Sequence, residues 1–324
     1  MAMNLNPEQA KQGVDALIKH CYGNLFTFLV SKINQSHKLS VASNSFIGIL
    51  DIFGFEIMKY NSLSQLCINF ANEKLQQQFN QQVFVREREL YLEEGLPVDV
   101  ITFKDNQPVI DLISKKPSGL LPLLEEAGML SRAVEPSALV SSFDKPHAGV
   151  HPNYDKARFG NEDFVIKHFA GEVLYSGKEL LSKNNDSLHE DLKILLSNST
   201  SDFIVNVCTQ FEKEGASGYV EKTEEEKERE LEMEEAKEAS SKKRGSAKTK
   251  LAASQTVTSK FRGQLNSLVE TLTSTEPHYI KCIKPNSSKS PTTANDELVL
   301  EQLRYSGVLE VVRIRREGFP IRMR

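Results

Sequence analysis

The sequence predicts an α/β fold, and three observations support this class. Residues 46–50 form an apolar run without alternation, which is typical of a strand covered on both faces in a parallel sheet. Residues 278–283 follow Pro277, and we interpret them as a second buried strand. Between the two, apolar residues recur at helical spacing in several stretches. A chain of 324 residues is long enough to bury a large core, and its length alone suggests about two domains.

The first expected helix extends from Pro7 to about Asn34. Proline is well suited to the first turn of a helix. Apolar side chains recur along this segment at helical spacing, at Val14, Leu17, Ile18, Cys21, Leu25 and Leu29. We expect this face to pack against the core. A second helix begins near Asn61 or Ser62 and continues to about Leu92, which is long for a globular protein.

Beyond residue 95 the chain alternates between short helical patterns and turns. The spacing predicts helices at 109–115, 120–130, 186–197 and 201–211. The first two flank a Lys-Pro-Ser-Gly turn, which predicts a helix–loop–helix. A polar stretch with proline and histidine follows. Alternation on both sides of Ala170-Gly171 then predicts a β-hairpin over residues 164–175.

The composition changes sharply after Phe211. Acidic residues dominate 212–238, and basic residues follow over 242–250. The apolar positions are too few for a coiled-coil seam, so we expect a solvated helix or a disordered insert. An amphipathic helix after Thr256 leads to Pro277, and a final helical stretch over 297–316 is interrupted near Gly307.

Charge and cysteine usage limit the function classes. Lys+Arg 40 against Asp+Glu 44 gives a net charge of −4, so no global basic field indicates a nucleic-acid partner. The cysteines lie far apart without a C-x-x-C pair, so we expect neither a zinc site nor a disulfide framework, and a reducing intracellular compartment is the default. The sequence shows no signal peptide and no apolar stretch of membrane-spanning length.

The segment from Asp51 to Glu56 carries the strongest functional signal. An aspartate at the carboxyl end of a strand can hold the magnesium shell in phosphate-switch proteins. A glycine follows three residues later, at Gly54, and its bare backbone can approach a γ-phosphate closely. Many buried strands end in aspartate, so the Asp-x-x-Gly pattern alone is weak evidence.

The full string Asp-Ile-Phe-Gly-Phe-Glu resembles switch II of the myosin motor domain. Other strings resemble further segments of that family in the family's order. They lie at 5–10 with 15–17 (the preceding helix), 69–76 (the relay helix), 105–108 with 111–113 (the relay loop and helix–loop–helix), 168–173 with 183–186 (a strand and the strut), 274–286, and 302–304 with 306–310 (the thiol-helix region). The resemblance covers nearly the whole chain except the charged insert.

The resemblance implies a partial motor domain over residues 1–324, with the α/β, P-loop NTPase-type fold of the family. Residues 1–211 would carry switch II, the relay and the actin-facing lower region. Residues 212–255 would be the charged surface loop known as loop 2, and 256–324 a central-sheet strand and the thiol helices. The family's thiol positions are occupied by Tyr305 and Arg315, and Val98 stands where a tryptophan is usual.

The resemblance also implies roles for the switch residues. Asp51 would order the magnesium-bound water shell without ligating the metal directly, and the Gly54 N–H would contact the γ-phosphate of ATP. Glu56 would pair with a switch I arginine that this sequence lacks. Gly307 and Gly318 would be hinge residues, with ordinary helix ends as the alternative.

Actin filaments are the partner that the resemblance implies. The basic cluster Lys242, Lys243, Arg244, Lys248 and Lys250 would face actin's acidic surface, although such a cluster is usually only a solvated loop. The helix–loop–helix would add apolar contact, with core packing as the alternative. Residues 265–286 resemble the family's actin-binding segment, and the candidate contacts there are Leu265, Asn266, Leu268, Val269, His278, Tyr279, Lys281, Lys284, Pro285 and Asn286. A buried sheet strand is the alternative for residues 278–283.

The sequence contains no G-x-x-x-x-G-K-S/T phosphate loop, no Asn- and Ser-rich switch I and no converter. We therefore expect part of an actin-based, ATP-driven motor in the cytoplasm and cytoskeleton that binds no ATP and Mg by itself. Its other partners would be the N-terminal half of the motor, and light chains or calmodulin through segments absent here. The alternative is a non-enzymatic actin-binding module that has lost the nucleotide site. A GTPase is not supported because both a phosphate loop and a guanine-reading motif are lacking.

Overall fold

The computed structural model describes residues 6–37, 46–97, 105–129, 134–185, 188–210 and 256–317. The chain divides into two compact units. The first comprises Met1–Gly48 and Asp186–Gln255, and the second comprises Ile49–Asn185 and Thr256–Arg324. The segment that resembles switch II and the long helix after it both belong to the second unit.

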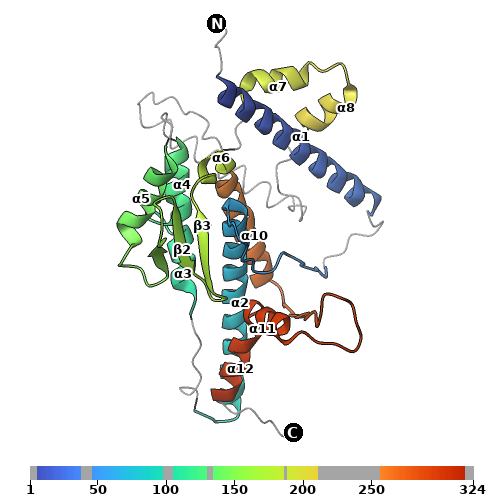
Figure 1. The fold of residues 1–324 in the computed structure, drawn as a ribbon. Coiled ribbons are helices and arrows are strands. Elements are labelled where there is room, and N and C mark those ends of the chain that lie inside the picture. The colour runs from blue at the N-terminus through green and yellow to red at the C-terminus, as the bar shows by residue number, and fades with distance from the viewer. Residues whose placement is uncertain are drawn as a thin grey trace, which may run out of the picture. The chain divides into compact units, whose positions relative to one another are not determined.

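Four helices make up the described part of the first unit (Figure 1): α1 (Pro7–Ser36), α7 (Glu190–Ser197), α8 (Asp202–Val205) and the π-helix η2 (Asn206–Gln210). One face of α1 packs against α8 and η2. There the rings of Phe28 and Phe203 meet edge to face, with their centres 5.7 Å apart. The expected core-facing stripe of α1 is not covered, because Val14, Ile18 and Leu29 remain at least half exposed. That expectation was wrong: the short helices α7 and α8 are too small to cover the whole stripe.

The second unit is organised around α2 (Leu63–Glu93), a helix of 31 residues. Ser62 precedes it, and the Gln65 side chain turns back to accept the Ser62 N–H at 3.0 Å, which stabilises the first turn. Figure 1 shows α2 as a rod with α10 beside it. The other helices of this unit are α3 (Gln107–Ser114), α4 (Leu120–Met129), α5 (Pro136–His147), α6 (Leu180–Asn184), α10 (Val257–Thr273), α11 (Asp296–Tyr305) and α12 (Val308–Glu317).

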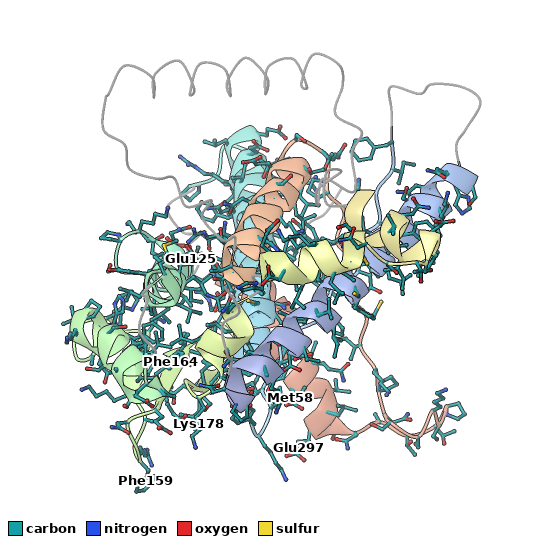
Figure 2. All side chains as sticks on the ribbon, turned by 90° about the horizontal axis from the view of Figure 1, so that it is seen from above. Met58, Glu125, Phe159, Phe164, Lys178 and Glu297 are labelled. Atoms are coloured by element: carbon teal, nitrogen blue, oxygen red, sulfur yellow. The ribbon has the colours of Figure 1, made fainter. Side chains whose placement is uncertain are left out.

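A three-stranded antiparallel sheet in the order β1-β2-β3 packs beside these helices. It consists of β1 (Tyr154–Lys156), β2 (Asp163–Lys167) and β3 (Glu172–Ser176). Phe164 pairs with Tyr175 across β2 and β3, which confirms the predicted hairpin. Inward and outward side chains alternate along the strands. In Figure 2, Phe164 lies within the unit, whereas Phe159 in the preceding turn projects at the periphery and is 88% exposed.

Apolar side chains from α2 to α6, the sheet and α10 form one core in the second unit. Leu66, Phe70, Ile113, Leu121 and Phe164 are each at most 1% exposed. Full burial of one such side chain stabilises a fold by about 1.5–3 kcal/mol. The core therefore fixes the position of α2 relative to the hairpin and to the helix–loop–helix formed by α3 and α4.

The two expected buried strands are absent, and this corrects the predicted fold class. Residues 46–50 and 278–283 have no regular secondary structure, and Ile47, Ile49 and Ile280 are 98%, 95% and 87% exposed. A strand requires a hydrogen-bonding neighbour, and within the described residues no strand lies beside either segment. The described chain is mostly helical with a small antiparallel sheet. Its polar stretch at 141–155 includes the second half of α5, which the sequence did not predict.

The helices predicted at 109–115, 120–130 and 186–197 and after Thr256 are confirmed, the stretch predicted from 201 is divided into α8 and the π-helix η2, and the charged insert at 212–255 lies outside the described residues. The final helical stretch breaks between α11 and α12 at Gly307, whose φ is +69°. The predicted helix–loop–helix corresponds to α3 and α4. Within the described residues, no helix is both long and apolar enough to cross a membrane.

Candidate functional site before and along helix α2

The segment that resembles switch II has no regular secondary structure and leads toward the start of α2. Asp51 and Gly54 are exposed, and a Cβ added at Gly54 would meet no atom within 4 Å. The Glu56 side chain is partly exposed, and within the described residues its carboxylate accepts a long hydrogen bond from Gln65 Nε2 at 3.4 Å. The polar groups of this segment therefore remain accessible to a ligand.

Phe55 anchors this exposed segment in the core. Its side chain is 6% exposed, and its ring lies 5.1 Å from the ring of His168, 5.5 Å from Phe169 and 5.7 Å from Tyr305. These neighbours come from the hairpin and from the end of α11. The sequence reasoning did not single out Phe55, although a large apolar residue between Gly54 and a glutamate signals an inward-facing side chain.

Asn69 on α2 holds the backbone on both sides of Glu56. Its Oδ1 accepts the Glu56 N–H at 2.8 Å, and its Nδ2 donates to the Glu56 carbonyl at 2.8 Å. One helical turn along, Asn72 Nδ2 donates to the Phe53 carbonyl at 3.0 Å. A side-chain amide that pairs with both backbone groups of one residue fixes that residue as a neighbouring strand would. A displacement of Glu56 must therefore move α2 or break these bonds.

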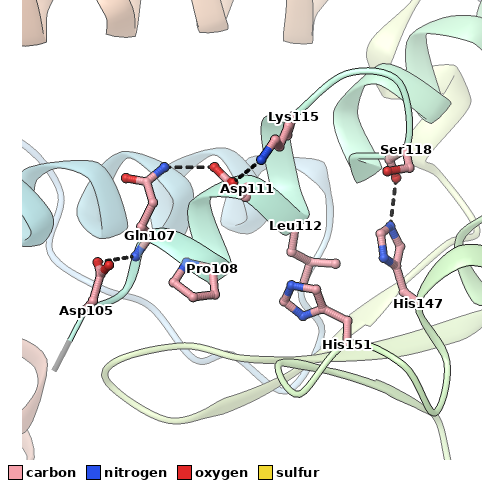
Figure 3. Close-up of a pocket in the computed structure, with 9 residues that line it drawn as sticks. All are labelled: Asp105, Gln107, Pro108, Asp111, Leu112, Lys115, Ser118, His147 and His151. Atoms are coloured by element: carbon pink, nitrogen blue, oxygen red, sulfur yellow. Dashed lines mark hydrogen bonds and ion pairs between the residues drawn. The ribbon is translucent and has the colours of Figure 1, made fainter.

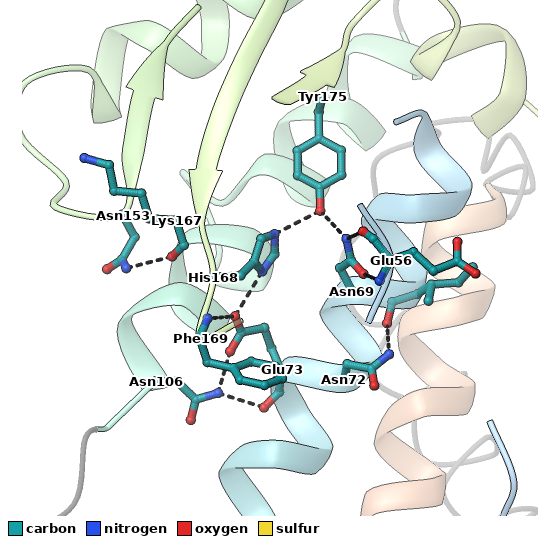
Figure 4. A network of polar contacts seen from close by, with 11 residues as sticks. Glu56, Asn69, Asn72, Glu73, Asn106, Asn153, Lys167, His168, Phe169 and Tyr175 are labelled. Carbon is teal, nitrogen blue, oxygen red and sulfur yellow. Dashed lines mark hydrogen bonds and ion pairs between the residues drawn. The ribbon is translucent and has the colours of Figure 1, made fainter. Parts of the chain in front are cut away.

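A buried polar network continues from Asn69 into the core (Figure 4). The side chains of Glu73 and His168 are both fully buried. Glu73 Oε1 accepts from His168 Nδ1 at 2.9 Å and from the Phe169 N–H at 3.0 Å. The Asn106 side chain, just before α3, donates to the Glu73 carboxylate and backbone carbonyl. One carboxylate thus joins α2, the hairpin and the start of the helix–loop–helix.

The hydroxyl of Tyr175 closes this network. It lies 2.9 Å from His168 Nε2 and accepts from Asn69 Nδ2 at 2.8 Å. Since the hydroxyl accepts from Asn69, its own proton is available for His168 Nε2, which leaves the imidazole proton on Nδ1, facing Glu73. Burial raises the pKa of Tyr175 well above its ordinary value, so the phenol keeps this proton. The chain of hydrogen bonds is continuous from the Glu56 backbone through Asn69, Tyr175 and His168 to Glu73, whereas at its end the buried Asn106 Oδ1 has no hydrogen-bond partner among the described residues.

The sequence reasoning missed this network because its members lie far apart in the chain. His168 is 95 residues from Glu73, and Tyr175 is 106 residues from Asn69. One signal was present: Leu66, Phe70 and Glu73 follow at helical spacing, which places a carboxylate on the core-facing side of α2. A charged residue in that position requires a buried partner.

The predicted hinge at Gly307 lies against α2. A Cβ added there would overlap the side-chain amide of Gln76. The positive φ itself favours glycine, and the Gln76 amide, at the end of a flexible side chain, would have to shift to admit a Cβ. Gly318, the other predicted hinge residue, and the side chain of Arg315 lie outside the described part of the chain, as does Val98.

Some of the predicted actin contacts lie outside the described residues, some are buried in the core, and some are exposed. The basic cluster Lys242, Lys243, Arg244, Lys248 and Lys250 lies outside the described residues. On α10, Leu265 is 4% exposed in the core, and Leu268 and Val269 pack partly against it. Asn266 is exposed, and its Oδ1 accepts a hydrogen bond from Lys74 of α2.

The segment after α10 contacts the second half of α2. Tyr279 places its ring 4.7 Å from that of Phe79, and its hydroxyl donates to Gln82 Oε1 at 2.8 Å. Lys281 Nζ lies 4.7 Å from the Phe79 ring centre, and partial burial lowers the pKa of Lys281. His278, Lys284 and Pro285 are exposed, and the buried Asn286 organises the following loop through hydrogen bonds to the carbonyls of Ser290 and Thr293.

A shallow depression of about 420 Å³ lies on the helix–loop–helix side of this unit (Figure 3). The polar groups that line it bond to one another. The Asp111 carboxylate accepts hydrogen bonds from Gln107 Nε2 and from Lys115 Nζ, each at 2.8 Å. The hydrogen bond from Lys115 holds the pKa of Asp111 below its ordinary value. His147 donates from Nε2 to the Ser118 carbonyl at 2.7 Å. In the described residues no group of histidine, cysteine and acidic side chains is arranged to hold a metal ion.

The geometry shows one segment with exposed polar groups that is tied to a long helix and lies against the end of α11, next to the helix break at Gly307. A family model described as myosin head (motor domain) matches residues 1–324. The chain belongs to the myosin head (motor domain) family.

Relatives from distant organisms are similar over nearly the whole chain. A Myosin-I heavy chain from Dictyostelium discoideum is 42% identical over 320 residues, which cover 98% of this chain and 12% of that protein. Myosin-15 from Arabidopsis thaliana is 41% identical over 318 residues, covering 98% and 19%. Unconventional myosin-Vc from Homo sapiens is 40% identical over 319 residues, covering 97% and 17%. The chain spans less than a fifth of the length of these relatives.

Proposed function

We propose that this chain supplies the switch II, relay and actin-facing part of an actin-based, ATP-driven motor. The observation that carries the proposal is the double hydrogen bond between Asn69 and the backbone of Glu56. Membership of the myosin head family supports it. Movement of the switch segment would reach α2 through this link, and α2 would carry the movement as one rigid body.

The exposed groups of the switch segment fit one end of a Mg-ATP complex. Asp51 would bind water molecules of the magnesium shell, and the Gly54 N–H, with open space beside it, would face the γ-phosphate. ATP would supply the phosphate bond whose hydrolysis drives the motor. These 324 residues contain no G-x-x-x-x-G-K-S/T, so they offer no cradle for the α- and β-phosphates. Glu56 would close the site against a cationic partner, and this chain by itself would not hydrolyse ATP.

The contacts of α2 give the movement a path to the hinge. The Phe55 ring touches Tyr305, at the end of α11, and Gly307 packs against Gln76 of α2. Both the switch segment and α2 therefore meet the break between α11 and α12. We propose that a shift of α2 changes the angle between these two helices at Gly307.

An actin-facing surface would be provided by the α3–α4 helix–loop–helix and by the basic cluster at 242–250. Exposed lysines and arginines raise the rate of association with an acidic filament and lose their effect as salt increases. Glutamates 224–238 would oppose this attraction. We expect weak and strongly salt-dependent binding to actin filaments, in the cytoplasm and cytoskeleton.

The exposed apolar side chains before Asp51 favour this function over a self-contained actin-binding module. Ile47 and Ile49 are almost entirely exposed, and Phe46 is 67% exposed. Contiguous exposed apolar residues of this kind mark a surface that is covered in a larger assembly. We propose that the rest of a motor domain covers them.

Co-sedimentation with actin filaments tests the proposal, with and without ATP and at low and moderate salt, on chain shown by circular dichroism to be folded. We expect binding at low salt that weakens at moderate salt and does not respond to ATP. A variant with glutamine at the five basic positions of 242–250 should bind less, and a matched variant with glutamine at five acidic positions of 224–238 should bind more. Absence of binding at low salt would refute the actin-facing role, and release by ATP would refute the inability to hold nucleotide.

A further inference from the structure

Two cysteine thiols of the first unit meet although they are 187 residues apart in sequence. The Sγ atoms of Cys21, on α1, and Cys208, on η2, are 4.0 Å apart. We propose that Cys21 and Cys208 form a reversible intramolecular disulfide when the protein meets a peroxide. This makes the pair a thiol oxidation site, which the sequence reasoning did not expect because the two residues share no short motif.

Packing around the pair sets its position independently of the two thiols. Cys21, Asn24 and Phe28 lie at i, i+3 and i+7 and therefore share one face of α1. Asn24 Nδ2 donates to the Cys208 carbonyl at 3.4 Å, and the Phe28 ring meets Phe203 at 5.7 Å. The contacts of Asn24 and Phe28 lie along the same face as the thiol contact. These two contacts therefore set how α1 aligns with the α8–η2 segment, and this alignment places the Cys21 and Cys208 sulfur atoms next to each other.

A small oxidant can reach the pair from solvent. Cys208 lines a partly open cavity of about 260 Å³ together with His20, Glu190, Lys193 and Ser197. Cys21 is itself partly exposed. A hydrogen peroxide molecule is only slightly larger than a water molecule, which needs about 30 Å³. Cys208 is 6% exposed, so we expect peroxide to reach its sulfur through this cavity.

The reaction balances with peroxide as the oxidant. The Cys208 thiolate attacks one peroxide oxygen, the O–O bond breaks, and the departing hydroxide takes up the thiol proton to leave as water. The sulfur of Cys21 then attacks the Cys208 sulfur, the S–O bond of the sulfenic acid breaks, and a second water leaves with the Cys21 proton. The two thiols lose two electrons in total, and the peroxide gains them. The sulfurs must approach from 4.0 Å to a bond length of about 2.05 Å, which side-chain rotation and a small helix shift can supply.

The other two cysteines differ in ways that make the pair selective. Cys67 is buried, as Cys208 is, and burial raises the pKa of its thiol to about 12, so little of it is thiolate; unlike Cys208, Cys67 lines neither of the two cavities described and has no cysteine beside it among the described contacts. Cys282 is exposed. We expect Cys282 to react singly with peroxide or to link two chains, a product that depends on protein concentration.

The disulfide would join α1 to η2 covalently and would close the chain between Cys21 and Cys208 into a loop. Since α1 precedes the switch-like segment along the chain, oxidation would restrict how far α1 can move away from the α8–η2 segment. A thiol reductant would reverse the restriction. The proposal does not depend on actin or nucleotide binding.

Peptide mapping of the full chain tests this site. The protein is treated with hydrogen peroxide at low protein concentration, remaining thiols are blocked with iodoacetamide, and peptides are separated without reductant. We expect a peptide pair joined through Cys21 and Cys208, lighter by two hydrogen atoms than the sum of its reduced parts and lost after dithiothreitol. The Cys282→Ser variant should give the same product at the same rate.

Two variants separate the steps. Cys21→Ser should prevent the disulfide and leave a Cys208 sulfenic acid that dimedone traps, and Cys208→Ser should also prevent it. Circular dichroism checks that both variants fold, and the wild-type map decides the question if either does not. The proposal is overturned if Cys208 in peroxide-treated wild type remains fully open to iodoacetamide, or if Cys21 is found joined to Cys282 instead.

Discussion

Removing the Tyr175 hydroxyl is a sharp perturbation because this group occupies the middle of the buried network. Tyr175→Phe keeps the ring, which stacks on Phe164 at 5.7 Å. It removes the hydrogen bond to His168 Nε2 and the one from Asn69 Nδ2. Both former partners are then left in a core that is closed to water, since Asn69 and the side chain of His168 are each 0% exposed.

The magnitude follows from these two losses. A typical hydrogen bond contributes about 1 kcal/mol net, and a buried polar group left without a partner costs about 1–3 kcal/mol. Asn69 keeps its bonds to Glu56, so the cost falls mainly on the acceptor nitrogen of His168. We expect Tyr175→Phe to lower the free energy of unfolding by about 2–4 kcal/mol.

Tyr154→Phe is a matched control, because that ring also stacks on Phe164 and its hydroxyl also makes a hydrogen bond. Its partner Asp144 retains an ion pair with Lys156 at 3.3 Å, so no buried group is orphaned. We expect a loss of about 0.5–1.5 kcal/mol.

Urea unfolding followed by circular dichroism measures both variants, since the sequence contains no tryptophan to report by fluorescence. Comparable midpoint shifts for the two variants, at unchanged slope, would refute the reasoning that the Tyr175 hydroxyl satisfies a buried partner that nothing else can satisfy.

Three further predictions concern the anchor, the hinge and the charged surface, and urea unfolding checks each. Phe55→Ala should lower the free energy of unfolding by about 3–5 kcal/mol because it empties a filled core position. Phe53→Ala, at a residue that is 72% exposed, should change it by no more than about 0.5 kcal/mol. Equal losses for the two variants would contradict the anchoring role of Phe55. Gly307→Ala should cost about 0.5–1.5 kcal/mol more than Gly95→Ala, since both have positive φ but only at Gly307 would the added Cβ displace the Gln76 amide, which donates to Asn80 Oδ1. The pKa of Asp111 is lowered below 3.8, so its stabilisation is complete above that pH and is lost as the pH falls through the lowered pKa. The stability difference between wild type and Asp111→Asn should therefore shrink in acid, and a difference that grows would contradict the sign.

The sequence predicted elements whose stability is local. The long helix α2, the β2–β3 hairpin and the break at Gly307 all follow from periodicity or from glycine, and the structure confirms them. Residues 46–50 failed as a strand because strand formation depends on a neighbour, which a single run of apolar residues cannot specify. The helix α5 was missed because Pro146 and its polar residues mask the helical spacing.

The candidate site was proposed from a resemblance, and its connections could not be predicted. The string from Asp51 to Glu56 resembles switch II of the myosin motor domain, and its nucleotide-binding role stays a prediction. The partners that hold it, Phe55, Asn69 and Glu73, became visible only when the fold brought distant residues together. The thiol pair on α1 and η2 is a similar case, because periodicity describes one element at a time and does not state which elements meet.

Hydrogen exchange at the Glu56 amide tests most directly the central claim that the switch segment is tied to α2 through Asn69. The amide donates to Asn69 Oδ1 at 2.8 Å in the wild-type chain, and mass spectrometry of a peptide covering residues 52–60 follows it. Asn69→Ala should raise its exchange rate by roughly tenfold or more, the equivalent of losing about 1.4 kcal/mol of protection. The control Asn72→Ala, which removes a hydrogen bond to the Phe53 carbonyl, should leave the Glu56 amide nearly unchanged. An Asn69→Ala chain that exchanges this amide at the wild-type rate would contradict the account.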